Sequence, residues 1–342
     1  MDSEHGPLFP RASKRSGVSP EASANSRTAG TRPGLYALIL VCVLYATLAY
    51  KLRTEGVFAC PAGELGGDRY VAYCNAQGFG DYDRGAFWFA LEPRIRENAA
   101  AADVLFIGNS RMQFAFSAKA TSDWFSAIRA RHFLLGFSHT ENVLFTGPLL
   151  ADLEPRARAY VINVDRFFDD IVTHPTNQIL RDGDVQSRYR EKRFWQSLHR
   201  PLCGVAPVFC GNRLSFVRYR DDGAWELGGT GALTATGIGD GLAMDQQNWS
   251  SYAAIAREFV SKLPVAGGCV ILTIAPYAET KIDEARAIAD SLGMPLLSPR
   301  LEGLRTFDAS HLDRPSAERW SAAFFDIAGP QLSACLSGSG VR

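Results

Sequence analysis

The fold class is decided by residues 103–111, which read DVLFIGNSR. Residues 104–107 are apolar on both faces of an extended strand, and Gly108 permits a tight turn where that strand ends. The residues that follow are compatible with a helix. A fully apolar strand that leads through a glycine turn into a helix is typical of a parallel sheet covered by helices.

The same pattern recurs along the chain. Apolar runs at 133–135 (closed by Gly136), 160–164, 269–274 and 294–297 alternate with amphipathic stretches such as 252–262 and 281–292. This alternation predicts an α/β fold, which we expect to be a three-layer α/β/α flavodoxin-like sandwich with a parallel sheet. In such sheets the active site lies beyond the carboxyl ends of the strands.

The domain organisation follows from changes in composition. Residues 1–34 are rich in Ser, Ala, Gly, Pro and Arg and are predicted to be a disordered cytoplasmic tail. We expect a transmembrane anchor at 35–52, a connecting segment at 55–100, and a catalytic domain at 101–330. That domain carries an insertion at 174–248, which lacks the alternating pattern and is interpreted as a lid or a substrate-shaping element.

The predicted anchor rests on an uncharged run, residues 35–50, which reads LYALILVCVLYATLAY. Five basic residues precede it and only Lys51 and Arg53 follow closely, which places the N-terminus in the cytoplasm. We therefore expect a single-pass protein of a bacterial inner membrane, with its catalytic domain in the periplasm. A buried core helix and a signal peptide cleaved after Val57-Phe58-Ala59 are the alternatives.

Charge and cysteine content restrict the expected binding partners, disulfides and metal sites. The formal net charge is zero, and no basic-aromatic stripe indicates nucleic acid. The arginines of the insertion suit an anionic polymer, although a solvated helix face is the simpler interpretation. Local spacing favours the disulfides Cys60–Cys74 and Cys203–Cys210, whereas Cys269 is expected to be a buried free thiol. No ligand spacing predicts a metal site.

Two short motifs carry residues suited to nucleophilic catalysis. Ser110 stands where the first strand meets a helix, although serine is also a common helix N-cap. Near the end of the chain, residues 308–312 read DASHL, so that Asp308 and His311 are three positions apart. A serine nucleophile needs a base, which histidine can provide when a carboxylate orients its ring. Taken separately, each motif favours the simpler interpretation: a serine N-cap for the first, and a turn aspartate beside a surface histidine for the second.

Together the two motifs resemble those of the SGNH/GDSL hydrolase family, in which the serine lies in the first block and the aspartate and histidine in the last. The resemblance covers residues 103–328 and implies a catalytic triad of Ser110, Asp308 and His311. It also implies an oxyanion hole formed by the backbone amides of Ser110 and Gly136 and by Asn163, with Asp165 occupying the same region as Asn163. The sequence departs from the family by having Asn109 before the serine and by lacking a Gly-x-Asn-Asp tetrapeptide.

The membrane anchor and the departure from the third (Gly-x-Asn-Asp) block look like those of family members that add or remove acyl groups on cell-wall polymers and exopolysaccharides. The resemblance thus implies a serine esterase or O-acyltransferase acting on acyl, above all acetyl, esters of an extracytoplasmic polysaccharide. Neither reaction needs a cofactor or a metal. The expected partners are the polysaccharide and a polysaccharide-assembly machinery. The alternative is a catalytically inactive protein of the same fold that binds or assembles carbohydrate.

Overall fold

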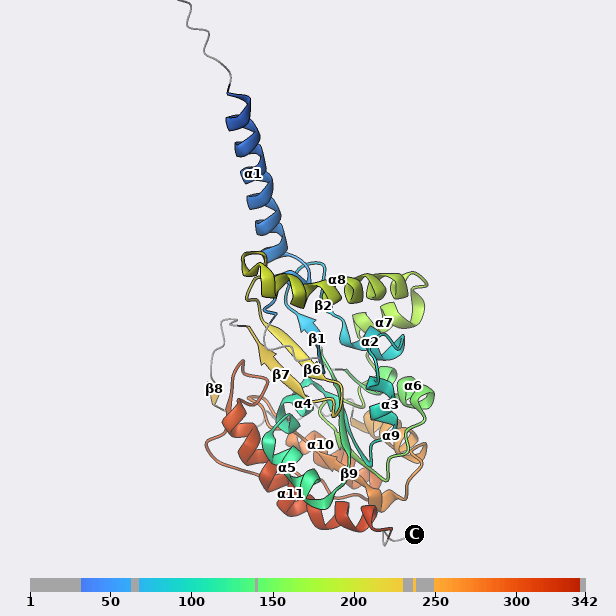
Figure 1. Ribbon diagram of the computed structural model, residues 1–342. Coiled ribbons are helices and arrows are strands. Elements are labelled where there is room, and N and C mark those ends of the chain that lie inside the picture. The colour runs from blue at the N-terminus through green and yellow to red at the C-terminus, as the bar shows by residue number, and fades with distance from the viewer. Residues whose placement is uncertain (1–31, 63–67, 139–140, 230–235, 238–248, 339–342) are drawn as a thin grey trace, which may run out of the picture. The chain divides into compact units, whose positions relative to one another are not determined.

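The computed structural model describes residues 32–62, 68–138, 141–229, 236–237 and 249–338 (Figure 1). The chain divides into two compact units, Met1–Tyr45 and Ala46–Arg342. The predicted tail at 1–34 lies almost entirely outside the described residues.

Helix α1 (Pro33–Thr54) contains the apolar run and is long and apolar enough to cross a membrane. Its 22 residues extend the predicted span by two residues at each end. Lys51 and Arg53 lie in its last turn, where long basic side chains can reach out of a membrane towards water.

The second unit contains a four-stranded parallel sheet in the order β4-β3-β5-β9. Its strands are β3 (Val104–Asn109), β4 (His132–Phe137), β5 (Ala159–Asn163) and β9 (Val270–Thr273). Every residue of β3, β5 and β9 is buried, as the apolar runs predicted. The predicted strand at 294–297 is reduced to one isolated parallel bridge between Leu272 and Leu296.

Alternate residues of the strands contribute to two separate hydrophobic cores. Leu105 and Ile107 belong to a core shared with α2 (Asp83–Trp88), α3 (Ile95–Ala100), α6 (Val143–Leu153), α9 (Trp249–Ser261) and α10 (Ile282–Leu292). Val104 and Phe106 belong to a second core, which they share with α4 (Ser110–Phe116), α5 (Lys119–Ile128) and α11 (Arg314–Leu336). This division follows from the two-residue period of a strand. The fold is therefore α/β, with helices packed against a parallel sheet.

A second, antiparallel sheet joins two distant segments. Its order is β2-β1-β6-β7, formed by β1 (Arg69–Cys74), β2 (Gly80–Asp81), β6 (Ser215–Tyr219) and β7 (Trp225–Gly228). The segment expected to be a connector thus pairs with strands of the predicted insertion. The insertion also contains α7 (His174–Arg181), α8 (Val185–Val205) and β8 (Thr236–Gly237), which pairs with β10 (Arg305–Thr306).

Three disulfides cross-link the second unit. Cys60–Cys74 and Cys203–Cys210 form as the local spacing predicted. The expectation of a free thiol at Cys269 is wrong, because this residue bonds to Cys335 in α11. Cys269 ends the short 3₁₀ helix η3 (Gly267–Cys269), just before β9, and η3 contacts α11. That proximity results from tertiary packing, which local sequence does not reveal.

Candidate active site

Ser110 lies at the first position of α4, where β3 leaves the sheet. Asn109 is the N-cap, and its side-chain oxygen accepts a hydrogen bond from the Arg111 backbone amide at 3.0 Å. The capping role that a serine commonly takes is therefore filled by its neighbour. The Ser110 hydroxyl is left for another contact, in a residue that is 9% exposed.

That contact is with His311, which lies 201 positions further along the chain. Ser110 Oγ is 2.8 Å from His311 Nε2, and His311 Nδ1 is 2.7 Å from Asp308 Oδ2. Because the carboxylate accepts from Nδ1–H, Nε2 is left as an acceptor for the serine hydroxyl. The structure thus brings the three predicted triad residues together in one hydrogen-bonded chain.

The loop that carries Asp308 and His311 is shaped around the carboxylate. Asp308 Oδ1 accepts hydrogen bonds from the backbone amides of Ser310 and His311, at 3.0 and 2.8 Å. Ala309, at the centre of this loop, has a φ of 65°, a left-handed conformation that non-glycine residues rarely adopt. Partial burial raises the pKa of Asp308, but the hydrogen bonds and charge of His311 outweigh it and hold this pKa below its usual 3.8. The carboxylate therefore stays ionised beside the imidazole at neutral pH.

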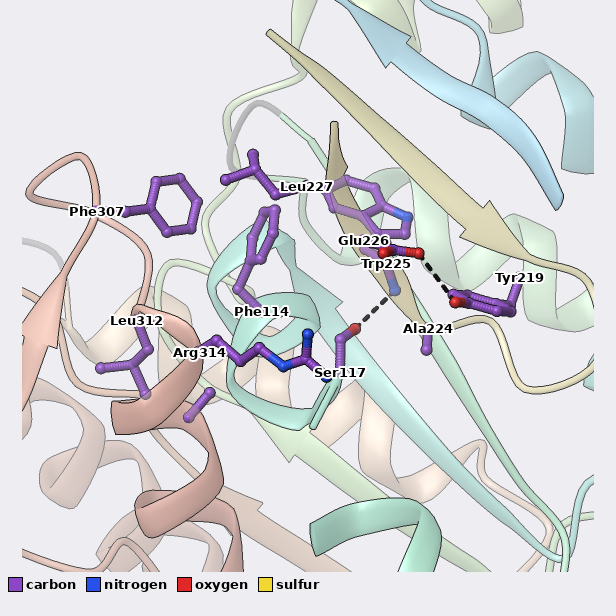
Figure 2. A pocket seen from close by; sticks show the side chains of 11 residues that line it. Phe114, Ser117, Tyr219, Ala224, Trp225, Glu226, Leu227, Phe307, Leu312 and Arg314 are labelled. Atoms are coloured by element: carbon purple, nitrogen blue, oxygen red, sulfur yellow. Dashed lines mark hydrogen bonds between the residues drawn. The ribbon is translucent and has the colours of Figure 1, made fainter. Parts of the chain in front are cut away.

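Aromatic side chains surround the imidazole. The ring centroids of Phe114 and Phe307 lie 4.9 and 5.5 Å from that of His311. The same two phenylalanines line a cavity of about 350 Å³, together with Trp225, Leu312 and Arg314 (Figure 2). No triad residue lines this cavity, so it lies one aromatic side chain away from the reacting groups.

The predicted oxyanion glycine lies inside β4 and does not end it. Gly136 pairs with Gly108, and the strand continues to Phe137, which pairs with Asn109. A Cβ atom at Gly136 would lie 2.8 Å from both the Asn109 carbonyl oxygen and Met112 Cε. A side chain is therefore excluded here by the packing of the α4 turn against β4, which gives this glycine a structural role.

The predicted oxyanion asparagine is also engaged in the framework. Asn163 is fully buried; its Nδ2 donates to Asn109 Oδ1 at 3.3 Å and its Oδ1 accepts from the Ala275 amide at 2.9 Å. The other candidate, Asp165, accepts from Asn109 Nδ2 at 2.9 Å. Both side chains thus support the turn that holds Ser110.

Arg111 connects the serine turn, the segment after β5 and the loop that carries Asp308 and His311. Its Nη1 donates to Asp165 Oδ2 at 2.5 Å, and its Nε donates to Ser310 Oγ at 3.0 Å. The guanidinium also stacks over the ring of Tyr277, 3.7 Å from the centroid. This residue therefore ties the serine turn to the loop that carries Asp308 and His311. Its place directly after Ser110 in the sequence made it a candidate for binding an anionic acceptor, with an arginine on a helix surface as the equal alternative.

Two fully buried arginines fix the strand and loop beside the serine turn. Arg84 pairs with Asp81 and Glu141 and donates to the Ser138 carbonyl, just after β4. Arg218 pairs with Asp83 at 2.6 Å and donates to the carbonyls of Leu134 and Gly136 in β4. These residues come from the connecting segment and the insertion. In the sequence, Asp81 and Asp83 beside Arg84 indicate a local ion pair, whereas no neighbouring residue indicates the pairing of Arg218.

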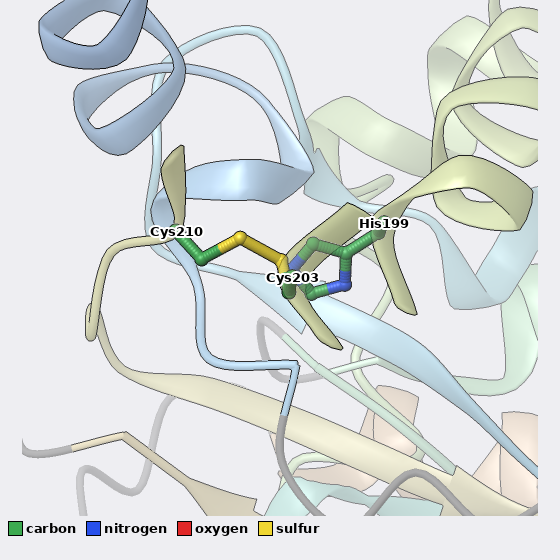
Figure 3. Close-up of side chains that lie close together, drawn as sticks. All are labelled: His199, Cys203 and Cys210. Atoms are coloured by element: carbon green, nitrogen blue, oxygen red, sulfur yellow. A yellow bond between two sulfur atoms is a disulfide. The ribbon is translucent and has the colours of Figure 1, made fainter. Parts of the chain in front are cut away.

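Among the described residues, one group has side chains close enough together to be considered as a metal site, formed by His199, Cys203 and Cys210 (Figure 3). The two cysteines are bonded to each other, so they offer no thiolate. One imidazole remains, which does not make a metal site. His139, which follows Gly136 by three positions in the sequence and is a further candidate on that ground, lies outside the described residues.

Comparison of the chain with protein-family models, with curated proteins and with solved structures gave no match in any of the three.

Proposed function

We propose that this chain is a membrane-anchored serine esterase or O-acyltransferase of the SGNH type, acting on acyl esters of an extracytoplasmic polysaccharide. One observation carries the proposal. Ser110, His311 and Asp308 form a continuous hydrogen-bonded chain with separations of 2.8 and 2.7 Å. This is the arrangement of nucleophile, base and orienting carboxylate that acyl transfer requires.

In the first half of the reaction, His311 Nε2 accepts the proton of Ser110 Oγ while this oxygen attacks the ester carbonyl carbon. The C=O electron pair moves onto the carbonyl oxygen, and Asp308 stabilises the imidazolium that forms. When the tetrahedral intermediate collapses, the alkoxide of the polysaccharide leaves and takes the proton from His311. An acyl group is then bound to Ser110.

The second half reverses these steps with a different acceptor. His311 takes a proton from water or from a sugar hydroxyl, which attacks the acyl carbon and releases Ser110. Water gives hydrolysis, and a sugar hydroxyl gives transfer. Which acceptor reaches the acyl-enzyme therefore decides between esterase and acyltransferase.

The negative charge on the carbonyl oxygen needs hydrogen-bond donors. The Ser110 amide is in the first turn of α4, where amides have no partner within the helix. The Arg111 guanidinium is the cation at the same turn. We propose these two groups as oxyanion donors in addition to the predicted Gly136 amide, while one N–H of Asn163 is engaged with the serine turn.

The location forms part of the same proposal. A helix long enough to span a membrane supports an anchor, and three disulfides are typical of an oxidising compartment such as the periplasm. We also propose that the sheet and its helices form a three-layer, flavodoxin-like sandwich. Fusion of alkaline phosphatase after residue 55 should give an active enzyme in a bacterial host. An inactive fusion would remove the periplasmic location and, with it, the polysaccharide substrate.

A serine-directed fluorophosphonate probe tests the chemistry on the full chain in detergent. We expect labelling of the wild type, loss of labelling in Ser110→Ala, and unchanged labelling in Ser187→Ala, which alters an exposed serine of α8. An activated acetyl ester, with and without an oligosaccharide, then separates release of acetate from acetylation of the sugar. A wild type that is folded but unlabelled would end the enzymatic proposal.

A second candidate function is that of an inactive carbohydrate-binding or assembly protein. The observation in its favour is that Asn163, the expected oxyanion donor, already donates one N–H to Asn109 Oδ1 and accepts from the Ala275 amide. This candidate predicts that Ser110→Ala leaves the biological role intact, whereas the enzymatic proposal predicts its loss.

A further inference from the structure

Helix α8 exposes apolar side chains on the face opposite to its buried one. It buries Val185, Tyr189, His199 and Cys203. Phe194, Leu198 and Val205 are 56%, 41% and 87% exposed, respectively. At about 100° per residue, these three side chains fall within roughly 40° of one another and about 180° from the buried face. The helix is therefore apolar on two opposite sides over its second half.

This exposed apolar surface is concentrated in one short segment. Outside α1, ten large apolar residues among those described are classed as exposed, and five of them lie between residues 194 and 208. Besides the three already named, these are Trp195, at 44%, and Val208, at 41%. Val205 and Val208 lie in the segment between Cys203 and Cys210, which a disulfide closes into a loop (Figure 3). A soluble surface seldom gathers apolar side chains in this way without a partner.

Exposed basic residues lie on one side of the apolar stripe: at about 100° per residue, Arg190 is roughly 60° from the centre of the stripe, and Arg193 and Arg200 are roughly 120° and 140° from it. The helix contains five basic residues and one acidic residue, and Arg190, Arg193 and Arg200 are all exposed. A helix that combines exposed aromatic and aliphatic side chains with long arginine side chains beside them is suited to the interface of a lipid bilayer. There the apolar side chains enter the acyl region, and the arginines contact phosphate groups.

The chain itself holds α8 near the end of α1. Helix α1 ends at Thr54, and Phe58, in the 3₁₀ helix η1 (Val57–Ala59), packs against α8. The ring of Phe58 is 6.4 Å from that of Trp195 and 5.4 Å from that of His199. His199 Nε2 is also 2.9 Å from the Cys60 carbonyl oxygen. Four residues span at most about 14 Å when fully extended, so Phe58, against which α8 packs, stays within that reach of the end of α1.

We infer that the second half of α8 and the Cys203–Cys210 loop form a membrane-contacting surface that lies on the lipid bilayer into which α1 inserts. Phe194, Trp195 and Leu198 enter the interface, and the exposed arginines bind anionic phospholipid headgroups. The inference rests on α1 as a membrane anchor and is independent of the acyl-transfer chemistry. Its consequence is that the domain has two attachments to the bilayer, which limits its rotation about the anchor.

The full chain, reconstituted into vesicles, provides the test. Helix α1 contains no tryptophan, so quenching of tryptophan fluorescence by phospholipids brominated near the headgroup reports on the domain alone. We expect quenching in the wild type of about one sixth of the emission, since Trp195 is one of six tryptophans. Trp195→Phe should abolish this quenching. The matched control Trp88→Phe, which changes a half-buried residue of α2, should retain it.

Lipid composition separates the contribution of the arginines from that of the apolar side chains. Quenching should be stronger in vesicles containing phosphatidylglycerol than in phosphatidylcholine alone, and the triple change of Arg190, Arg193 and Arg200 to glutamine should remove that difference. Phe194→Ser with Leu198→Ser, both at exposed positions, should reduce quenching in both lipids. Circular dichroism matched to that of the wild type checks that these variants are folded.

Several results would overturn the inference. Unquenched wild-type protein, or quenching that persists in Trp195→Phe, would show that α8 does not touch lipid. Protein that fails to float with the vesicles would remove the anchor on which the inference depends. If soluble heparin changes Trp195 emission and vesicles do not, the surface is a site for an anionic polymer. If the protein is not quenched in vesicles and has twice the monomer mass in detergent, a second copy of the chain covers this surface and the lipid bilayer does not.

Discussion

Arg111→Met tests whether the buried ion pair with Asp165 holds the serine turn in place. Asp165 has a side chain that is 0% exposed, and Arg111, at 15%, is its cationic partner at 2.5 Å. Removing one member of a buried pair costs about 3–5 kcal/mol, because a charge is left without compensation. Asn109 Nδ2 still donates to Asp165 at 2.9 Å, so we expect the lower end of this range, about 3 kcal/mol.

The assay is urea unfolding of the full chain in detergent, followed by tryptophan fluorescence. Arg286→Met is the matched control, because Arg286 pairs with Asp283 at 2.9 Å but both side chains are exposed, and such pairs contribute about 0–1 kcal/mol. Adding Asp165→Asn to Arg111→Met should recover most of the lost stability, since the double change removes the uncompensated charge. Equal losses in Arg111→Met and Arg286→Met would refute the reasoning, as would a double variant no more stable than Arg111→Met.

Three further predictions concern the site and its framework. Asp308→Asn should lower turnover of an activated ester roughly 10⁴-fold in steady-state kinetics, because the imidazole then takes the wrong tautomer. Because the pKa of Asp308 is lowered in the folded chain, its ionised form stabilises the fold, and this stabilisation is lost as the pH falls below 3.8. The difference in Tm between the wild type and Asp308→Asn should therefore become smaller below that pH, and a difference that stays constant would contradict this. Gly136→Ala should lower the free energy of unfolding in urea by about 1–3 kcal/mol, because the added methyl group would collide with the α4 turn. Gly183→Ala, at a position with no atom nearby, should leave this free energy nearly unchanged. Cys335→Ser should cost about 4 kcal/mol, because its disulfide closes a loop with a separation of 66 residues; unchanged stability would exclude that cross-link.

Local patterns in the sequence determined several parts of this protein. Residues 104–107 had to form a strand buried on both faces, since they are apolar at every position. Asp308 and His311, three positions apart in a loop, could meet without help from the rest of the chain. The uncharged run at 35–50 could form a long apolar helix by itself. In each case the information lies within one element or one turn.

The tertiary structure decided which distant groups meet. Gly136 and Asn163 could be assigned to an oxyanion hole by their order in the chain, but only sheet register and packing decided which groups surround them. The cross-link of Cys269 to Cys335 and the pairing of β1 with β6 join segments far apart in sequence. The contact between Ser110 and His311 has the same origin. The periodicity of the sequence determines which side of a helix or strand a side chain occupies. Contacts between helices and strands depend on how their whole surfaces pack, and a local sequence pattern does not predict this packing.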